Sequence, residues 1–355
     1  MDLIISLISV CISVIAITLS YITFKKQQYT QAYSDLDLMY FEILKLGLEY
    51  PDLRNQSKTS KYYTLPKDDP YRIRYETYAN ICWNLCEAIY DRQKKVGGRL
   101  KISATWTPVL LEENKLHQVW FSHNLRLFKK DFQIFIKDSV NSIEIIKITD
   151  YNSKDYRSAI EIYEKQFPIE ERKSIAQIET LLSRKNYTLL IARHKYIDNI
   201  IGFAFVLFNN DPHFLLLDYM AIDPMFQRCG FGTIFFNSIV EMQTSSSLGI
   251  LLELEKPQLA GNERDKANRD DRIQFYLQSG CTLLDEIDYK LPNANGKPIS
   301  MTLAFKPNPA ITVLPAETIK SLIINVYDKI HSDVPDIECL FQSFTSTIHD
   351  QHFLK

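Results

Sequence analysis

The spacing of apolar and polar residues divides this chain into segments of different character. Residues 3–24 carry no charged side chain, and about 20 such residues are what a helix needs to cross a bilayer. Because Asp2 precedes this run and Lys25-Lys26 follow it, the positive-inside rule predicts a single transmembrane helix with the rest of the chain in the cytoplasm. A cleaved signal peptide would need a basic start and a small-residue cleavage site, and this sequence has neither.

Residues 25–140 show helical spacing of apolar positions in several segments, separated by a polar linker at 55–70 and by Gly97-Gly98. This pattern predicts a juxtamembrane helical bundle. Cys82 and Cys86 lie one helical turn apart, but no nearby His or Cys pair completes a metal site, so we expect core thiols and no metal. Partner contact, homo-oligomer formation and placement of the next domain all stay open as roles for this bundle.

From Ser142 the pattern changes to short apolar runs that alternate with helical segments. This order predicts an α+β domain over 142–306. The expected strands are 143–148, 188–193, 200–208, 215–222, 250–255, 282–286 and 300–305, and the expected helices are 155–166, 174–183, 233–242 and 273–278. The remaining residues, 307–355, form a predicted C-terminal helical tail with one helix at 315–331.

One stretch of this domain combines a strand, a glycine turn and a helix. The run Leu215–Ile222 is apolar apart from Asp218, and Asp223-Pro224 ends it because proline cannot donate to a sheet ladder. Gly230 and Gly232 allow positive φ and close approach of a ligand. The amides that open the following helix would favour a phosphate, through unpaired N–H groups and the helix dipole.

The segment Gln227-Arg-Cys-Gly230-Phe-Gly232 resembles the pyrophosphate loop of the GNAT superfamily of acyl-CoA-dependent N-acetyltransferases. The order of strands and helices over 142–306 is also similar to that family, which implies a mixed central sheet flanked by helices. A dinucleotide-binding loop would need a further glycine at position 235, where Phe stands. The resemblance implies acetyl-CoA as co-substrate, held by Met220, Ala221, Ile222, Gln227, Arg228, Cys229, Gly230, Phe231, Gly232 and Thr233.

Four residues are candidates for proton transfer. Asp218 is the only charged residue in its strand, and a carboxylate placed there without a partner would be costly to bury, so we interpret it as the base for the acceptor amine. Glu253 and Glu255 share one face of the next strand because they are two apart, and they are the alternatives. The resemblance implies that Tyr276, shortly before Gly280, is the general acid for the leaving thiolate.

Two positions depart from the family pattern. Cys229 stands where a basic residue or glycine is common, and Arg269 stands where the family has an asparagine near the start of its last helix. The segments 167–172, 256–271 and 289–298 are expected to select the acceptor amine, with Glu170 and Glu171 as possible attractors of a cation. The net charge of −2 and a pI near 6.4 give no reason to expect nucleic acid as a partner.

The sequence therefore predicts a membrane-anchored cytoplasmic N-acetyltransferase that acts on a small-molecule or peptide amine. Two alternatives of other classes stay open at this point. The domain could bind an acyl-CoA without turnover and signal through the bundle, or the chain could be a structural membrane scaffold. Binding of acetyl-CoA without release of free thiol would favour the sensor, and absence of any binding would favour the scaffold.

Overall fold

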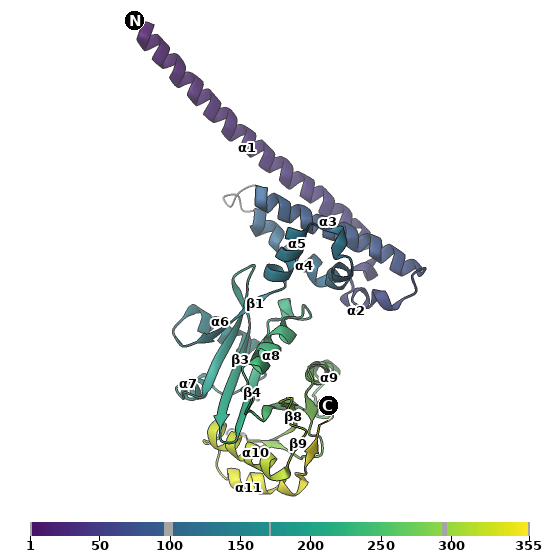
Figure 1. Cartoon of the computed structure of the whole chain (residues 1–355), viewed down its shortest axis with the longest axis vertical. Helices are drawn as coiled ribbons and strands as arrows, with labels where there is room; N and C mark the ends of the chain where they lie inside the picture. The colour runs from purple at the N-terminus through teal and green to yellow at the C-terminus, as the bar shows by residue number, and fades with distance from the viewer. Residues whose placement is uncertain (1, 96–101, 170–171, 293–296, 354–355) are drawn as a thin grey trace. The chain divides into compact units, whose positions relative to one another are not determined.

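The computed structural model describes residues 2–95, 102–169, 172–292 and 297–353, apart from the side chains of 2–11, 28, 29, 32, 95 and 102–104. The chain forms two compact units, residues 1–140 and 141–355 (Figure 1). The C-terminal residues from 307 onward therefore belong to the second unit. Predicted features at Gly97-Gly98 and at Glu170-Glu171 lie outside the described residues.

The first unit is helical. Its long elements are α1 (Asp2–Glu49), α3 (Pro70–Lys95) and α4 (Ile102–His123), and Figure 1 draws α1 as one long helix. Short elements connect and complete them: η1 (Pro51–Arg54), α2 (Gln56–Thr59), η2 (Tyr62–Thr64), η3 (Leu125–Leu127), α5 (Lys130–Phe135) and the π-helical η4 (Ile136–Val140). Trp83 of α3 is fully buried and stacks on Phe121 of α4 with ring centroids 3.9 Å apart, so aromatic packing holds these two helices together.

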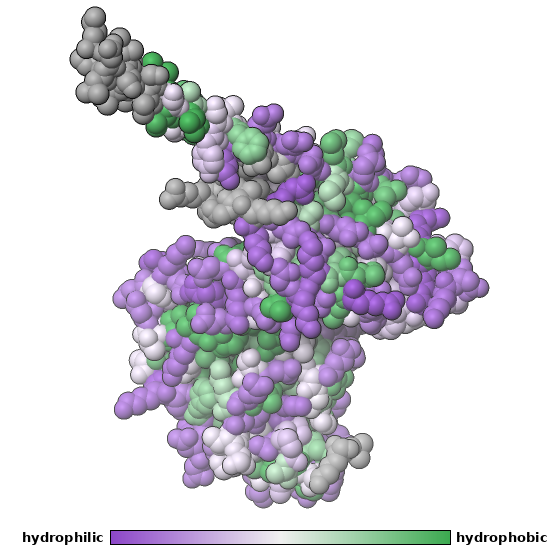
Figure 2. All heavy atoms as spheres, turned by 45° about the horizontal axis from the view of Figure 1, so that its top comes forward, coloured by the Kyte–Doolittle hydropathy of each residue, from purple (hydrophilic) through white to green (hydrophobic). Residues whose placement is uncertain are grey.

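The predicted transmembrane helix at 3–24 is not supported. None of the described residues form a helix that combines the length and the apolar character required to cross a bilayer. Residues 3–11 of the predicted span have side chains outside the described part, and from Ile12 the uncharged run reaches only Phe24 before Lys25. Apolar side chains of this stretch are exposed along α1, next to the grey residues of Figure 2: Ile12, Val14, Ile15, Ile17, Leu19, Ile22 and Phe24.

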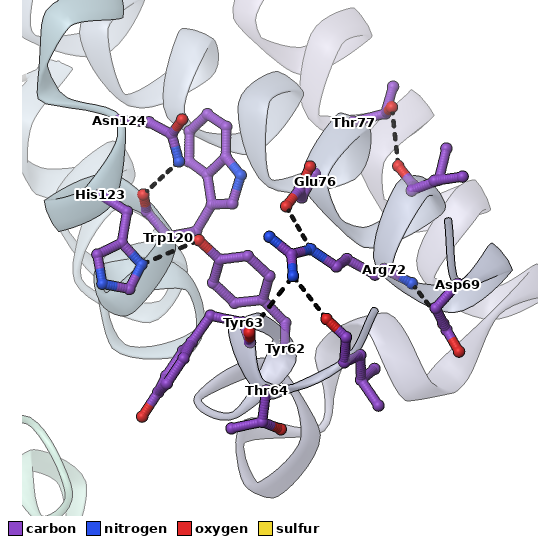
Figure 3. Close-up of polar contacts among 12 residues, drawn as sticks. Tyr62, Tyr63, Thr64, Asp69, Arg72, Glu76, Thr77, Trp120, His123 and Asn124 are labelled. Carbon is purple, nitrogen blue, oxygen red and sulfur yellow. Dashed lines mark hydrogen bonds and ion pairs between the residues drawn. The ribbon is translucent and has the colours of Figure 1, made fainter. Parts of the chain in front are cut away.

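The segment predicted as a polar linker is ordered by hydrogen bonds to the helices on either side of it (Figure 3). The Arg72 guanidinium donates to the Leu65 carbonyl at 2.6 Å and to the Glu76 carboxylate at 2.9 Å. The Tyr62 hydroxyl contacts Nδ1 of His123 at 3.1 Å, so this histidine has a structural role. One arginine and one tyrosine thus fix η2 against α3 and the end of α4.

The second unit is a mixed sheet covered by helices on both faces. The strands follow the order β1-β2-β3-β4-β5-β8-β6, with β7 paired to β8, and β4 and β5 are its parallel pair. Their bounds are β1 Ile143–Ile148, β2 Tyr187–His194, β3 Asn199–Asn210, β4 His213–Ile222, β5 Gly249–Glu255, β6 Thr282–Leu283, β7 Lys290–Leu291 and β8 Ile299–Pro307, with a small separate pair β9 (Val313–Leu314) and β10 (Gln351–His352).

Two hydrophobic cores lie on opposite faces of the sheet because side chains alternate along each strand. On one face α6 (Lys154–Gln166), α7 (Ile175–Leu182) and α10 (Ala316–Ile330) cover a core that includes Phe205, Leu216 and Leu251. On the other face α8 (Phe231–Glu241) and α9 (Glu263–Gln278) cover a core that includes Leu217 and Leu252. The predicted helix of the C-terminal tail is α10, and its apolar face packs into the first core. The elements α11 (Ile337–Gln342) and η7 (Thr345–Thr347) follow it.

The helix α9 starts ten residues earlier than the predicted 273–278, at Glu263. Its first turns are charged and lack an apolar stripe, so hydrophobic spacing could not reveal them. The helix begins there because the Asn262 side chain accepts a hydrogen bond from the amide of Asp265, as expected of an N-cap.

Candidate active site

The parallel strands β4 and β5 separate soon after they meet. Within the described residues they pair only from Leu215–Ile250 to Leu217–Leu252. On its other edge β4 stays paired with β3 as far as Ile222, but the register shifts so that Leu217 faces Val206 and Tyr219 faces Phe205. Asp218 is therefore an extra residue in the ladder, a β-bulge, which bends its strand. The bend comes where pairing to β5 stops.

The three residues predicted to hold the co-substrate by their backbone lie beyond this bulge. Met220, Ala221 and Ile222 pair with β3 through one edge. Their other edge lies on the side of β5 but does not pair with it, because the β4–β5 pairing ends at Leu217. A strand edge of this kind can accept an extended chain as an additional strand.

The predicted glycine turn is open at its tip. Gly230 has φ +84° and is exposed, and a side chain built there would meet nothing within 4 Å. It is the N-cap of α8 and supplies no side-chain hydrogen bond to the first turn. The amides of Phe231, Gly232 and Thr233 open that helix, so this end suits an anion.

The turn also lies close to the end of β4 and to α9. A side chain built on Gly232 would be 3.5 Å from Phe275 and 3.8 Å from Ile222. Gln227 Nε2 donates to the Ile222 carbonyl at 2.8 Å, and the Arg228 guanidinium lies 3.4 Å from the Asp271 carboxylate. Cys229 is buried in the core beneath α8, so its thiol fills a packing position and does not line the turn.

Asp218 is enclosed by hydrogen-bond donors. Its oxygens accept from Lys173 Nζ at 2.9 and 3.1 Å, and one of them also accepts from the Tyr187 hydroxyl at 2.5 Å. The Asp218 side chain is 2% exposed and that of Lys173 is 12% exposed. Asp218, which the sequence indicated as a group for proton transfer, is therefore also half of a buried ion pair that links β4 to the segment before α7.

Replacing Asp218 with Asn should lower the free energy of unfolding by about 3 kcal/mol, because loss of one partner leaves a buried charge unpaired. Urea denaturation of the full chain measures this loss. The double variant with Lys173→Met is the control, and we expect it to recover most of the stability. Equal instability of the single and double variants would contradict a charge-based effect.

Glu253 and Glu255 have different surroundings although they share a face of β5. Glu253 accepts a hydrogen bond from the Tyr289 hydroxyl. Burial, and then the negative charge of Asp218, raise the pKa of Glu253 to about 7. Glu255 is buried and pairs with Arg272 of α9. Glu253 combines a half-buried position with a pKa near neutrality, which is what a general base needs.

Tyr276 lies on the opposite face of the sheet from these carboxylates. It is buried in the core beneath α8 and α9 together with Ile222 and Leu254, and its ring packs edge-on against Phe236. Burial raises the pKa of its hydroxyl, so the group is protonated at neutral pH and suits a proton donor. The split between β4 and β5 thus has base candidates on one face and the acid candidate on the other.

Residues 153–259 match the family model of the acetyltransferase (GNAT) family. The chain contains a GNAT acetyltransferase domain. Among solved structures, a GNAT-family acetyltransferase from Bacteroides thetaiotaomicron is 25% identical, with a TM-score of 0.44 over 54% of this chain and 99% of that one. An aminoglycoside 6'-N-acetyltransferase complexed with coenzyme A is 18% identical, with a TM-score of 0.35 over 47% and 99%.

The ribosomal-protein-S18-alanine N-acetyltransferase from Escherichia coli is also 18% identical, with a TM-score of 0.32 over 47% of this chain and 96% of that one. No curated protein matches the chain. The family model, which covers the bulge, the turn and β5, therefore carries the assignment.

A pocket of about 400 Å³ opens on the carboxylate side of the GNAT domain. Tyr219 and Lys173 form part of its wall, so it adjoins the Asp218 ion pair. Two of the segments expected to select the acceptor reach it, through Arg172 and through Leu291-Pro292. The described residues of 256–271 do not line it.

The sequence did not indicate the rest of this wall. Residues 330–334, from the end of α10 into the loop before α11, line the pocket together with residues of α7. Gln177 of α7 donates to the Asp333 carboxylate at 2.6 Å, which joins the two sides. The apolar stripe of α10 predicted a packed helix but could not show which surface it covers, so the contribution of the C-terminal segment to the GNAT domain appears only in the structure.

Proposed function

We propose that the GNAT domain transfers an acetyl group from acetyl-CoA directly to an amine. The observation that carries this proposal is the early separation of β4 from β5 beside an open glycine turn at the start of α8. These two features offer an extended chain the edge of β4 that β5 does not cover, and they offer its phosphates the amides that open α8.

The residues that fit acetyl-CoA are those of the turn and of the end of β4. Amides of Arg228 to Thr233 would hold the pyrophosphate, and the backbone of Met220, Ala221 and Ile222 would align the arm that carries the thioester. The co-substrate supplies the activated acyl group. Holding two reactants in register lowers the barrier by roughly 7–11 kcal/mol.

We assign the base to Glu253, with Asp218 and Glu255 as the alternatives. An amine with pKa about 10.4 is almost fully protonated at neutral pH, so a proton must leave it before the nitrogen attacks the thioester carbonyl. Glu253 would accept that proton, directly or through water. The Asp218 carboxylate is less suited to this role because it already accepts hydrogen bonds from Lys173 and Tyr187. The C–S bond then breaks, and Tyr276 would protonate the leaving thiolate.

The acceptor amine is proposed to enter through the pocket beside Tyr219 and Lys173, because that pocket opens on the same face of the sheet as Glu253. Its wall combines aromatic and apolar groups with the polar side chains of Gln177 and Asp333 and with three cationic side chains, Arg172, Lys173 and Arg184. A small amine or an amino-terminal peptide would fit this volume, and the substrate class is the part of the proposal that a screen must decide.

The test is release of free CoA thiol by the full chain with acetyl-CoA and a panel of amines, read with a thiol reagent. Amine-dependent thiol release, with acetylated product in a mass spectrum, supports the proposal. A thermal shift by acetyl-CoA without thiol release for any amine would favour the sensor, and absence of any shift would contradict co-substrate binding.

The variant Tyr276→Phe should lower kcat by about 10- to 100-fold and leave acetyl-CoA affinity within about twofold. General acid catalysis is worth roughly 10²–10⁴ in rate, and a thiolate with a pKa near 8.5 needs less help than an alkoxide or amide. Steady-state kinetics and calorimetric titration with acetyl-CoA measure the two quantities. An equal loss of rate and of acetyl-CoA affinity would indicate that Tyr276 only packs against Phe236 in the core beneath α8 and α9.

The predicted localisation, a single-pass membrane protein with its GNAT domain in the cytoplasm, stays a proposal based on sequence. It rests on the uncharged run 3–24 and on the lysines that follow. Fractionation of cells that express the full chain tests it, with Ile15→Asp as the comparison, since an aspartate near the centre of a span costs about 2.5–3.5 kcal/mol. Recovery of the unmodified chain in the soluble fraction would contradict it.

A further inference from the structure

Three side chains that can bind metal meet in the core of the first unit. Cys82 comes from α3, and Glu113 and His117 lie one turn apart on α4. All three are fully buried. One ligand atom from each lies within 4.8 Å of the others. The sequence could not pair them because Cys82 stands 31 residues before Glu113.

In Glu113 and in His117, one polar side-chain atom has a hydrogen-bond partner and the other has none in the described part of the chain. Oε1 of Glu113 accepts from the Arg54 guanidinium at 2.9 Å, and Nδ1 of His117 contacts the Tyr75 hydroxyl at 3.2 Å. The remaining atoms, Oε2 of Glu113 and Nε2 of His117, are buried without a hydrogen-bond partner in the described part of the chain. Buried polar atoms are nearly always satisfied, so this pair needs an explanation.

The separation of the two leftover atoms fits two ligands of one ion. Nε2 of His117 and Oε2 of Glu113 are 3.5 Å apart, which is long for a hydrogen bond. Zinc binds nitrogen and oxygen at about 2.0–2.2 Å in a tetrahedral arrangement, which places two such ligands about 3.3–3.5 Å from each other. The outer contacts from Tyr75 and Arg54 orient the two ligands, as groups behind metal ligands commonly do.

We propose that Cys82, Glu113 and His117 form a zinc site in the helical unit. A thiolate, an imidazole and a carboxylate form a ligand set suited to Zn²⁺. Binding releases one proton to solvent, from the Cys82 thiol, because only the thiolate coordinates. The thiolate and the Glu113 carboxylate neutralise the two charges of the ion, and Arg54 adds one further positive charge at Oε1 of Glu113. The competing explanation is a metal-free Arg54–Glu113–His117 network.

Cobalt substitution distinguishes the two. The full chain, stripped with a chelator, is titrated with Co²⁺, which gives an intense near-ultraviolet charge-transfer band only when a thiolate binds it. All proteins in the test carry Cys339→Ser, since that thiol is exposed. We expect the band to saturate at one equivalent and to disappear when one equivalent of Zn²⁺ displaces the Co²⁺. Absence of the band in this parent chain overturns the proposal without any further variant.

The matched pair Cys82→Ser and Cys86→Ser identifies the ligand, since both thiols are fully buried on α3 one turn apart. Cys82→Ser should lose the band and Cys86→Ser should keep it, and the reverse result overturns the assignment. Tyr75→Phe tests the outer contact and should weaken Zn²⁺ binding by about 10- to 100-fold. Unchanged Zn²⁺ affinity in that variant would overturn the assignment of Tyr75 as the group that orients His117.

Discussion

Replacing Glu253 with Gln should lower kcat by about 10²- to 10⁴-fold with little change in acetyl-CoA affinity, as expected when a general base is removed. Gln keeps the size of the side chain and can still contact the Tyr289 hydroxyl, so the fold is preserved. Steady-state kinetics with the best amine of the panel gives the rate, and circular dichroism confirms that the variant is folded. Glu255→Gln, two residues along the same face of β5, is the matched comparison.

The pH profile provides a second, independent signature of Glu253. Because its pKa is raised to about 7, a base at this position is protonated and inactive below that pH and ionised above it. The rate should therefore rise with pH through about 7 and then level off. Hydrogen bonding from Tyr289 lowers this pKa, so Tyr289→Phe should move the rise to higher pH. Loss of the rise in Asp218→Asn, with its retention in Glu253→Gln, would transfer the role to Asp218.

Replacing Gly230 with Glu should weaken acetyl-CoA binding by about 10³-fold. The residue is exposed with positive φ at the start of α8, so the new carboxylate would stand where the pyrophosphate is expected. Two unit charges about 4 Å apart near a protein surface repel by about 4 kcal/mol, which corresponds to roughly that factor. Isothermal titration with acetyl-CoA measures the change.

The control for Gly230→Glu is Gly261→Glu. Gly261 is also exposed, and a side chain there also meets nothing within 4 Å, but its φ lies outside the positive range. This second substitution adds the same charge away from the turn, so acetyl-CoA affinity should change by less than about twofold. If both variants lose affinity equally, net charge is responsible and the turn is not the phosphate site.

The sequence revealed those parts of the GNAT domain whose chemistry is local. A strand ended by Asp-Pro, a turn with glycines and a helix with an apolar stripe occupy neighbouring residues, so their relation needs no tertiary information. The strands β1 to β5 were predicted within two residues at each end of the structure's bounds. The roles assigned to Asp218, Glu253, Glu255 and Tyr276 stay predictions.

What the sequence could not reveal depends on contacts between distant segments. Lys173 and Tyr187 surround Asp218 from 45 and 31 residues away, and this enclosure is what moves the preferred base to Glu253. The wall formed by residues 330–334 and the meeting of Cys82 with Glu113 are of the same kind. Hydrophobic periodicity identifies a buried face but does not name the surface that the face will cover.

The single unmatched residue of β4 makes the opening in the sheet a matter of residue count rather than of side-chain identity. Deletion of the one residue between Leu217 and Tyr219 would remove the bulge, while every later residue of β4 keeps its partner on β3 and its present face of the sheet. A one-residue deletion there is therefore expected to straighten β4 and to close the proposed entrance for the acyl donor.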